Sequence, residues 1–166
     1  MLETTAKEGS TAECPICIEA LHTARVAVFV EVNEGKPSRR TCPHFVHAAC
    51  AEEMARRGGG QLSCPLCRVP CDDHRTVPLI EENPRAWFAA VDAAGDGRLS
   101  RREVELALVA QFPLDPTRLG RELDEKFGIW DHDGSGHVSA AEFIEPGTGM
   151  LDHVRKYLLE TADNRV

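Results

Sequence analysis

The hydrophobic and polar positions divide the chain into a β-rich first part and a helical second part. Residues 25–32 are dominated by β-branched side chains, which predicts a strand, and the Asn, Gly and Pro within residues 33–37 predict the turn that ends it. A helix-forming run follows over residues 49–57, and three consecutive glycines end that helix at residue 58. The longest purely apolar run, residues 26–30, is too short to span a bilayer.

Two helix–loop–helix units of the same design make up most of the second part. The first begins at Asn83, a favoured N-cap that a proline follows, and its helix leads into an acidic loop over residues 92–103. The second begins at Asp115, again followed by a proline, and leads into an acidic loop over residues 131–142. The two loops start 39 residues apart, which indicates an internal repeat.

A last amphipathic segment follows Pro146 and Gly147. Its apolar positions recur with helical spacing, which predicts a helix over about residues 149–161. This helix could cover the apolar surface of the two units, or it could simply pack against them. The apolar positions are Met150, Leu151, Val154, Tyr157 and Leu158.

Composition and charge narrow the classes of partner. The 166 residues allow one or two small domains and carry a net charge of −8, nearly all of it on residues 76–166. This acidic second part argues against a nucleic-acid partner and for cation binding. The polar start, residues 1–10, shows no secretory signal, so we expect a reducing compartment, cytoplasmic or nuclear, and no membrane span.

Six of the seven cysteines and two histidines form four closely spaced pairs. The two side chains of a pair lie on one tight turn and can bind the same metal ion. In a reducing compartment, paired cysteines indicate zinc ligands rather than disulfides. Eight ligands suffice for two closed tetrahedral sites, which leave no open coordination position for catalysis. In chain order the candidate ligands are Cys14, Cys17, Cys42, His44, His47, Cys50, Cys64 and Cys67.

In these ligands and their spacing, residues 14–68 resemble the RING finger family, in the variant with histidines at the fourth and fifth ligand positions. The resemblance implies a cross-brace in which the ligand pairs interleave around two Zn²⁺. The first and third pairs would hold one ion, and the second and fourth pairs would hold the other. The implied ligand sets are Cys14, Cys17, His47 and Cys50 for one ion, and Cys42, His44, Cys64 and Cys67 for the other.

RING domains commonly act as ubiquitin ligases, and the resemblance implies how this chain would do so. Such domains have no nucleophile; they hold a ubiquitin-charged conjugating enzyme in a closed conformation, so that a substrate lysine attacks the thioester more readily. The resemblance implies an apolar groove for the conjugating enzyme at Ile16, Pro65 and Leu66. It implies a cation that bridges enzyme and ubiquitin at Arg68, where a planar guanidinium can donate several hydrogen bonds. The alternatives are local packing for Ile16 and Leu66 and a solvated surface charge for Arg68.

One position departs from the family pattern, and four residues lie outside it. Many ligases carry a Trp four residues after the sixth ligand, where this chain has Met54, whose flexible thioether can still fill a groove. The change bears on which conjugating enzymes would bind. Cys71 has no pairing partner and is expected to be a spare thiol, and His22, His74 and His153 are expected at the surface.

The second acidic loop, residues 131–142, resembles the calcium-binding loop of the EF-hand family. It has side-chain oxygens at positions 1, 3 and 5, a backbone carbonyl at position 7 and a bidentate Glu at position 12, with Gly136 at the sharp turn of position 6. Ca²⁺ prefers six to eight such hard oxygens. The implied ligands are Asp131, Asp133, Ser135, His137 and Glu142.

The first acidic loop, residues 92–103, matches the same pattern less well. Position 3 is Ala94, which has no side-chain oxygen, so we expect weaker calcium binding. The alternative is a silent partner loop that pairs with the other loop through Leu99 and Val138 and binds no ion. The implied ligands are Asp92, Asp96, Arg98 through its carbonyl, and Glu103.

The predicted fold is therefore a small zinc-stabilised α+β RING cross-brace followed by an all-α EF-hand pair. The predicted divisions are a mobile tail (1–12), a RING-type zinc finger (13–70), a linker (71–83), an EF-hand pair (84–145) and a C-terminal amphipathic helix (146–166).

The expected function is that of a RING-type ubiquitin ligase, a transferase without a covalent intermediate, that responds to one or two Ca²⁺. Its partners would be a ubiquitin-conjugating enzyme, ubiquitin and an unidentified protein substrate. One alternative is a non-enzymatic calcium-binding adaptor that uses the RING as an interaction module. Another is a calcium buffer that carries an incidental RING.

Overall fold

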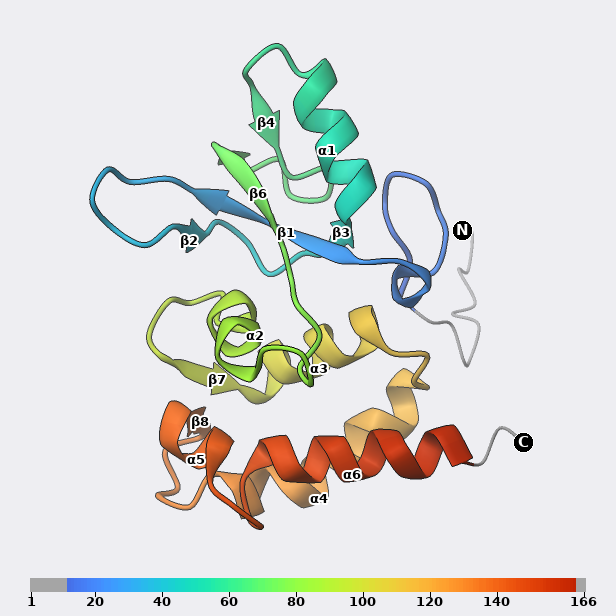
Figure 1. Ribbon diagram of the computed structural model, residues 1–166, viewed down its shortest axis with the longest axis vertical. Helices are drawn as coiled ribbons and strands as arrows, with labels where there is room; N and C mark the ends of the chain where they lie inside the picture. Colours follow the sequence, from blue (N-terminus) through green and yellow to red (C-terminus); the bar gives the residue numbers. More distant parts are fainter. Residues whose placement is uncertain (1–11, 164–166) are drawn as a thin grey trace, which may run out of the picture.

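The computed structural model describes residues 12–163, and it shows a mixed α/β part followed by a helical part (Figure 1). We call residues 12–83 the Cys/His module and residues 84–163 the helical module. The tail predicted over residues 1–12 lies outside the described residues except for Ala12. Within residues 12–163, no helix is long and apolar enough to cross a membrane.

A four-stranded antiparallel sheet forms the centre of the Cys/His module. Strand β1 (Val26–Glu31) is almost wholly buried, which confirms the strand predicted from its β-branched residues. It pairs with β2 (Arg39–Arg40), β3 (Val46–His47) and β6 (Asp73–Thr76). The sheet therefore gathers segments from both ends of the module around one apolar strand.

Short elements surround this sheet and carry the cysteine pairs. The 3-10 helix η1 (Leu21–Thr23) precedes β1, and α1 (Ala48–Arg57) confirms the helix predicted before the three glycines. The hairpin of β4 (Leu62–Ser63) and β5 (Pro70–Cys71) follows α1. These elements are too short to form an apolar core of their own.

The segment predicted as a linker, residues 71–83, is instead part of the packed structure. It contains β6, which pairs with β1 over four residues from Asp73 to Thr76, and it buries Val77 and Ile80 completely. The strand was missed because its sequence, Asp-His-Arg-Thr, has no apolar alternation. A polar edge strand is recognisable only once its partner strand is known.

The helical module begins with α2 (Pro84–Val91). The Asn83 side chain caps it by accepting a hydrogen bond from the amide of Ala86 at 3.1 Å, and Asp115 caps α4 (Pro116–Trp130) by accepting from the amide of Arg118 at 2.7 Å. Both helix starts predicted from Asx-Pro pairs are confirmed. The remaining elements are β7 (Arg98–Ser100), α3 (Arg101–Gln111), β8 (His137–Ser139), α5 (Ala140–Ile144) and α6 (Met150–Asp163).

The two helix–loop–helix units are joined by their loops and by an aromatic core. Strands β7 and β8 pair antiparallel with Leu99 opposite Val138, which confirms the predicted bridge between the loops. Trp87 of α2 stacks on Phe143 of α5 with ring centroids 5.7 Å apart. This core links the first helix of one unit to the last helix of the other.

The two modules meet at a junction where their buried apolar residues form one continuous cluster, to which a few polar contacts are added. Strand β6 continues directly into the loop before α2, and η1 packs against α3 (Figure 1). The buried Trp87 indole donates to the Gln111 side-chain oxygen at 2.7 Å, and the Gln111 amide donates to the Pro78 carbonyl at 3.0 Å. Arg25 and Glu82, both in the Cys/His module, form a half-exposed ion pair at 2.6 Å just before α2, a type that contributes little to stability.

Candidate metal centres

The eight Cys and His side chains lie in two groups of four. In each group the four candidate ligand atoms lie within 4.8 Å of one another, so each group could hold a metal ion. The first Cys/His cluster joins the first and third pairs, and the second joins the second and fourth pairs, which is the interleaved grouping that the resemblance implied. The first cluster is Cys14, Cys17, His47 and Cys50, and the second is Cys42, His44, Cys64 and Cys67.

Two of the cysteine pairs are held in turns of the same shape. The amide of Ile18 donates to the Cys14 carbonyl at 2.9 Å, and the amide of Arg68 donates to the Cys64 carbonyl at 2.8 Å. Ile18 and Arg68 have φ of 63° and 62°, a left-handed conformation that non-glycine residues rarely adopt. The matched geometry places both sulfur atoms of each pair on one side of a tight turn.

His47 is oriented so that one ring nitrogen is available for a metal. Its Nε2 lies 3.1 Å from the Ala20 carbonyl and 3.2 Å from the Leu21 carbonyl, which only accept hydrogen bonds, so Nε2 carries the proton. The unprotonated Nδ1 lies 3.2 Å from Cys17 Sγ. A ring that donates its second N–H to a carbonyl is the usual arrangement of a metal-ligating histidine.

The donor sets fit zinc. Each cluster offers three thiols and one imidazole, and a tetrahedral site with Zn–S bonds of about 2.3 Å would need sulfur atoms about 3.8 Å apart. Burial, followed by a hydrogen bond to Cys17, raises the pKa of Cys50 to about 12, and burial raises that of Cys64 to about 11. A divalent cation would offset this cost of crowding buried thiolates.

The second cluster has the same chemistry with a different histidine environment. His44 Nδ1 lies 3.5 Å from Cys64 Sγ. Burial, and then the nearby Arg40 guanidinium, lower the pKa of His44, so its ring is neutral and able to act as a ligand at neutral pH.

The residues implied for a partner surface are mostly exposed. Ile16 and Leu66 occupy corresponding places in the two matched turns and are 37% and 55% exposed. Pro65 and Arg68 are exposed as well, whereas Met54 on α1 is half-buried against the core. A single exposed apolar residue is common and indicates little. Two exposed apolar residues at corresponding places of matched turns, Ile16 and Leu66, are a stronger indication of a surface for a partner.

The second acidic loop gathers carboxylates. Oxygen atoms of Asp131, Asp133 and Glu142 lie within 4.8 Å of one another and could hold a metal ion. Burial opposes ionisation of Asp131, yet hydrogen bonds from the backbone of Gly136 and Ser135 outweigh it and hold the pKa of this carboxyl below its usual value. The Ser135 hydroxyl lies 3.2 Å from an Asp131 oxygen and 3.1 Å from the His137 carbonyl, so two further predicted ligands lie next to this group of carboxylates.

The first acidic loop repeats the main hydrogen bonds of the second but has Ala94 where the second has a carboxylate. Its Glu103 accepts hydrogen bonds from the amides of Ala93 and Ala94 at 2.8 and 3.0 Å, and Asp92 accepts from the amide of Gly97 at 2.8 Å. Within residues 12–163, the carboxylates of this loop do not form one of the groups that could hold a metal ion. Weaker calcium binding here, through Asp92, Asp96, Arg98 and Glu103, stays a prediction.

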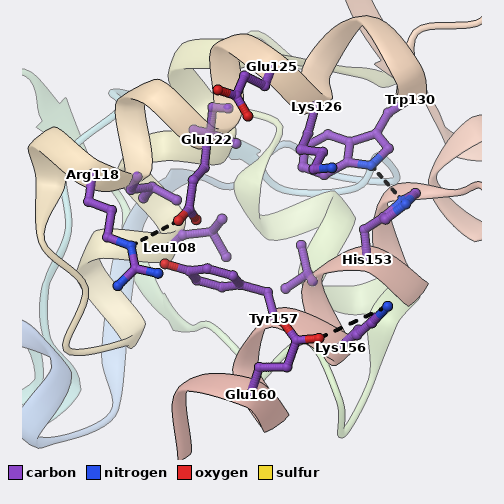
Figure 2. Close-up of a pocket in the computed structure, with 13 residues that line it drawn as sticks. Leu108, Arg118, Glu122, Glu125, Lys126, Trp130, His153, Lys156, Tyr157 and Glu160 are labelled. Carbon is purple, nitrogen blue, oxygen red and sulfur yellow. Dashed lines mark hydrogen bonds and ion pairs between the residues drawn. The ribbon is translucent and has the colours of Figure 1, made fainter. Parts of the chain in front are cut away.

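A cavity of about 440 Å³ lies between α4 and α6 (Figure 2). Trp130 donates its indole N–H to His153 Nδ1 at 2.9 Å, which fastens α6 to α4, and Tyr157 projects into the space between them. The ion pair of Arg118 and Glu122, 2.9 Å apart, lies at its edge. The last helix therefore forms one wall of a groove that charged side chains border.

The residues expected outside the sites differ in part from prediction. His22, His74 and His153 are all half-buried, so their placement as surface residues is wrong in this respect. Cys71 is half-buried in β5, and burial, followed by the proximity of Cys64, raises its pKa to about 11. Cys71 belongs to neither Cys/His cluster.

Comparison with family models and with solved structures adds nothing to this geometry. No family model matches the chain, and no solved structure matches it. The structure nonetheless brings together eight Cys and His residues and three carboxylates that the sequence had singled out. Arg40, which contacts the second Cys/His cluster from a two-residue strand, was missed because a pair of arginines carries no signal of burial.

Proposed function

We propose that this chain is a RING-type ubiquitin ligase whose Cys/His module folds around two Zn²⁺ and whose helical module binds Ca²⁺. The observation that carries the proposal is the grouping of the ligand pairs, first with third and second with fourth. When ligand pairs interleave in this way, each site joins two pairs that are separated in the chain by a pair of the other site. Two zinc sites that simply follow one another would each use adjacent pairs. This grouping supports the cross-brace that the RING resemblance implies.

The zinc ions would supply structure and no chemistry. Each site has four protein ligands, so no coordination position is left for water or substrate. The residues that would act on a charged conjugating enzyme are those at the surface of the two matched turns: Ile16 and Leu66 would contact apolar side chains, and Arg68 would donate hydrogen bonds to enzyme and ubiquitin. Transfer of ubiquitin to a lysine would follow from holding the thioester in place.

Calcium would act through the second acidic loop. Asp131, Asp133 and Glu142 would bind it with side-chain oxygens, and Phe143, next to Glu142, stacks on the buried Trp87. Trp87 is hydrogen-bonded to Gln111, which in turn donates to Pro78 at the junction. Buried contacts thus run from the calcium loop to the Cys/His module, which supports a calcium-responsive ligase.

A non-enzymatic calcium-binding adaptor is the second candidate. Its support is Met54, a half-buried residue at the place where many RING ligases expose a Trp. Without that aromatic anchor, the surface of the two turns could bind a protein without activating it. The two candidates differ only in whether ubiquitin is transferred.

The test is self-ubiquitination with purified components across several conjugating enzymes. Ile16→Ala and Arg68→Ala should each lower the rate by roughly tenfold, since a contact at the centre of an interface is worth about 1–2 kcal/mol. Val32→Ala and Arg75→Ala, which change exposed residues outside the two turns, serve as matched controls. Absence of transfer with every enzyme would favour the adaptor, and equal rates with calcium and with chelator would remove calcium regulation of activity.

A further inference from the structure

Arg40 is a buried arginine that joins the two modules. Its side chain projects from β2, and the residue is 7% exposed. The guanidinium donates to the carbonyls of Cys42 at 3.1 Å and His44 at 3.3 Å in the Cys/His module. It also donates to the carbonyls of Ala90 at 3.2 Å and Val91 at 3.1 Å, in the last turn of α2.

The guanidinium remains charged in this environment. Burial lowers its pKa to about 10, while the negative charges of Cys42, Glu103 and Asp92 act in the opposite direction. The group also lies 4.6 Å above the centre of the Phe45 ring, a cation–π contact. A buried cation is costly unless its donors are paired, so these contacts hold the side chain in one place.

The contacts to Cys42 and His44 bear directly on the second Cys/His cluster. The opposing pair in this cluster is held by its own turn, since the amide of Arg68 donates to the Cys64 carbonyl. In the part of the chain that the structure describes, the turn from Cys42 to His44 has no backbone hydrogen bond of this kind between its own residues. Arg40 provides two bonds to that turn instead.

Charge favours the same arrangement. A Zn²⁺ ion with three thiolates and one neutral imidazole has a net charge of −1, and a fixed guanidinium beside it balances that charge. On its other side Arg40 meets the C-terminal end of α2, where free carbonyls and the helix dipole favour a cation. One side chain thus satisfies a metal-ligand turn and a helix end at once.

We propose that Arg40 is a positioning residue for the second Cys/His cluster and that it couples this metal centre to the C-terminal end of α2. The inference rests on the part of the proposed function that places Zn²⁺ in this cluster. It needs no ubiquitin ligase activity. The coupling reaches the first acidic loop, because that loop begins directly after α2 at Asp92.

The neighbouring Arg39 provides a matched control. It lies on the same strand, is exposed, and donates to the carbonyl of Ala94 in the first acidic loop at 3.0 Å. Arg39 thus contacts the helical module without contacting the Cys42–His44 turn. Arg39→Met should leave the metal centre unchanged, whereas Arg40→Met should not.

The experiment uses the full chain loaded with ¹¹³Cd²⁺ in place of zinc. Each thiolate-bound ion gives its own NMR signal, far from oxygen-bound cadmium, and correlations to ligand protons assign it to one cluster. In Arg40→Met the signal of the second cluster should shift, and the chelator TPEN should remove that ion about 10–100-fold faster than from the unchanged protein. The first cluster should keep its signal and its rate, as should both clusters in Arg39→Met.

Hydrogen exchange tests the coupling to α2. Cys67→Ser, which removes a ligand of the second cluster, should speed amide exchange in residues 84–92, and Cys17→Ser should do so less. In a chain that already carries Arg40→Met, Cys67→Ser should add nothing in these residues. If Arg40→Met does not fold, Arg40→Lys is the second variant, because a lysine keeps the charge but cannot reach four carbonyls.

The outcomes separate this inference from the proposed function. Fewer than two thiolate-bound signals in the unchanged protein would overturn the metal part of the proposed function and this inference with it. Two signals that respond equally to Arg40→Met would overturn the positioning role alone. An amide exchange rate in residues 84–92 that is the same with and without Cys67→Ser would overturn the coupling to α2.

Discussion

The Cys/His module and the helical module reach a stable arrangement by different means. In the first, the two largest fully buried side chains are Phe29 of β1 and Ile80 of the loop before α2, and three of the buried apolar residues are candidate ligand cysteines. In the second, the large side chains of Trp87, Phe143, Leu123 and Met150 are fully buried and make up the larger part of the cluster that both modules share. Metal binding would therefore compensate for the small apolar core of the Cys/His module, whereas the helical module buries enough apolar side chains that a metal ion would only add to its stability.

Removal of zinc should have the largest effect and should act on one module. Structural zinc contributes about 10–16 kcal/mol in small peptides, far more than a single short sheet can supply. We expect TPEN to abolish protection from hydrogen exchange in residues 12–71. Both tryptophans, Trp87 and Trp130, lie in the helical module, so their fluorescence should keep the emission of buried indoles.

The opposite result would show that the two modules do not depend on metal separately. If the tryptophan emission shifted to that of exposed indole together with the loss of protection, the two modules would unfold as one unit. The apolar cluster that the two modules share would then couple their unfolding more strongly than the hydrogen bonds of the junction do. Calcium should be present throughout, so that only zinc is removed.

Truncation of the helical core should have the next largest effect. Trp87→Ala should lower the free energy of unfolding of the helical module by about 3–5 kcal/mol, because it leaves a cavity against Phe143. Trp87→Phe keeps most of the volume but leaves the Gln111 oxygen without its donor, which should cost about 1–3 kcal/mol. Denaturant unfolding followed by circular dichroism at 222 nm measures both free energies of unfolding. If the two variants lost equal amounts, the ring volume that Trp87→Phe keeps would contribute nothing to stability.

Calcium should have the smallest effect, and it should depend on one loop. At a calcium concentration 100 times its dissociation constant, binding should stabilise the helical module by about 2.7 kcal/mol. Glu142→Gln should remove this gain, whereas Glu103→Gln should preserve most of it, because the first acidic loop lacks a carboxylate at Ala94. Thermal unfolding with and without calcium measures the difference, and an equal loss in both variants would make the loops equivalent.

Local signals allowed much of this structure to be predicted. Helix starts at Asn83 and Asp115, the strand at β1 and the ligand pairs depend on residues a few positions apart, so each could be recognised from the sequence. The bridge between Leu99 and Val138 was also predictable, because two copies of one loop pattern imply one pairing. The RING and EF-hand assignments stay predictions.

The contacts between the modules were not predictable in the same way. Strand β6 has a polar sequence, so its place beside β1 depends on a partner more than 40 residues earlier in the chain. In the sequence Gln111 is a single polar residue at a helix end, and nothing near it in the chain identifies Trp87 and Pro78 as its hydrogen-bond partners. Sequence spacing does not reveal such partners, since each residue satisfies its hydrogen bonds with whatever the fold brings close.

The eight candidate Cys and His ligands and the three carboxylates of the second acidic loop could be identified from the sequence alone, because short-range spacing and turn chemistry select them. Only the tertiary structure decided that Arg40 would be buried between a ligand turn and the end of α2. The reason is physical: a guanidinium is tolerated in the interior only where several carbonyls converge, and here some of them come from the end of α2, with Ala90 lying 50 residues after Arg40.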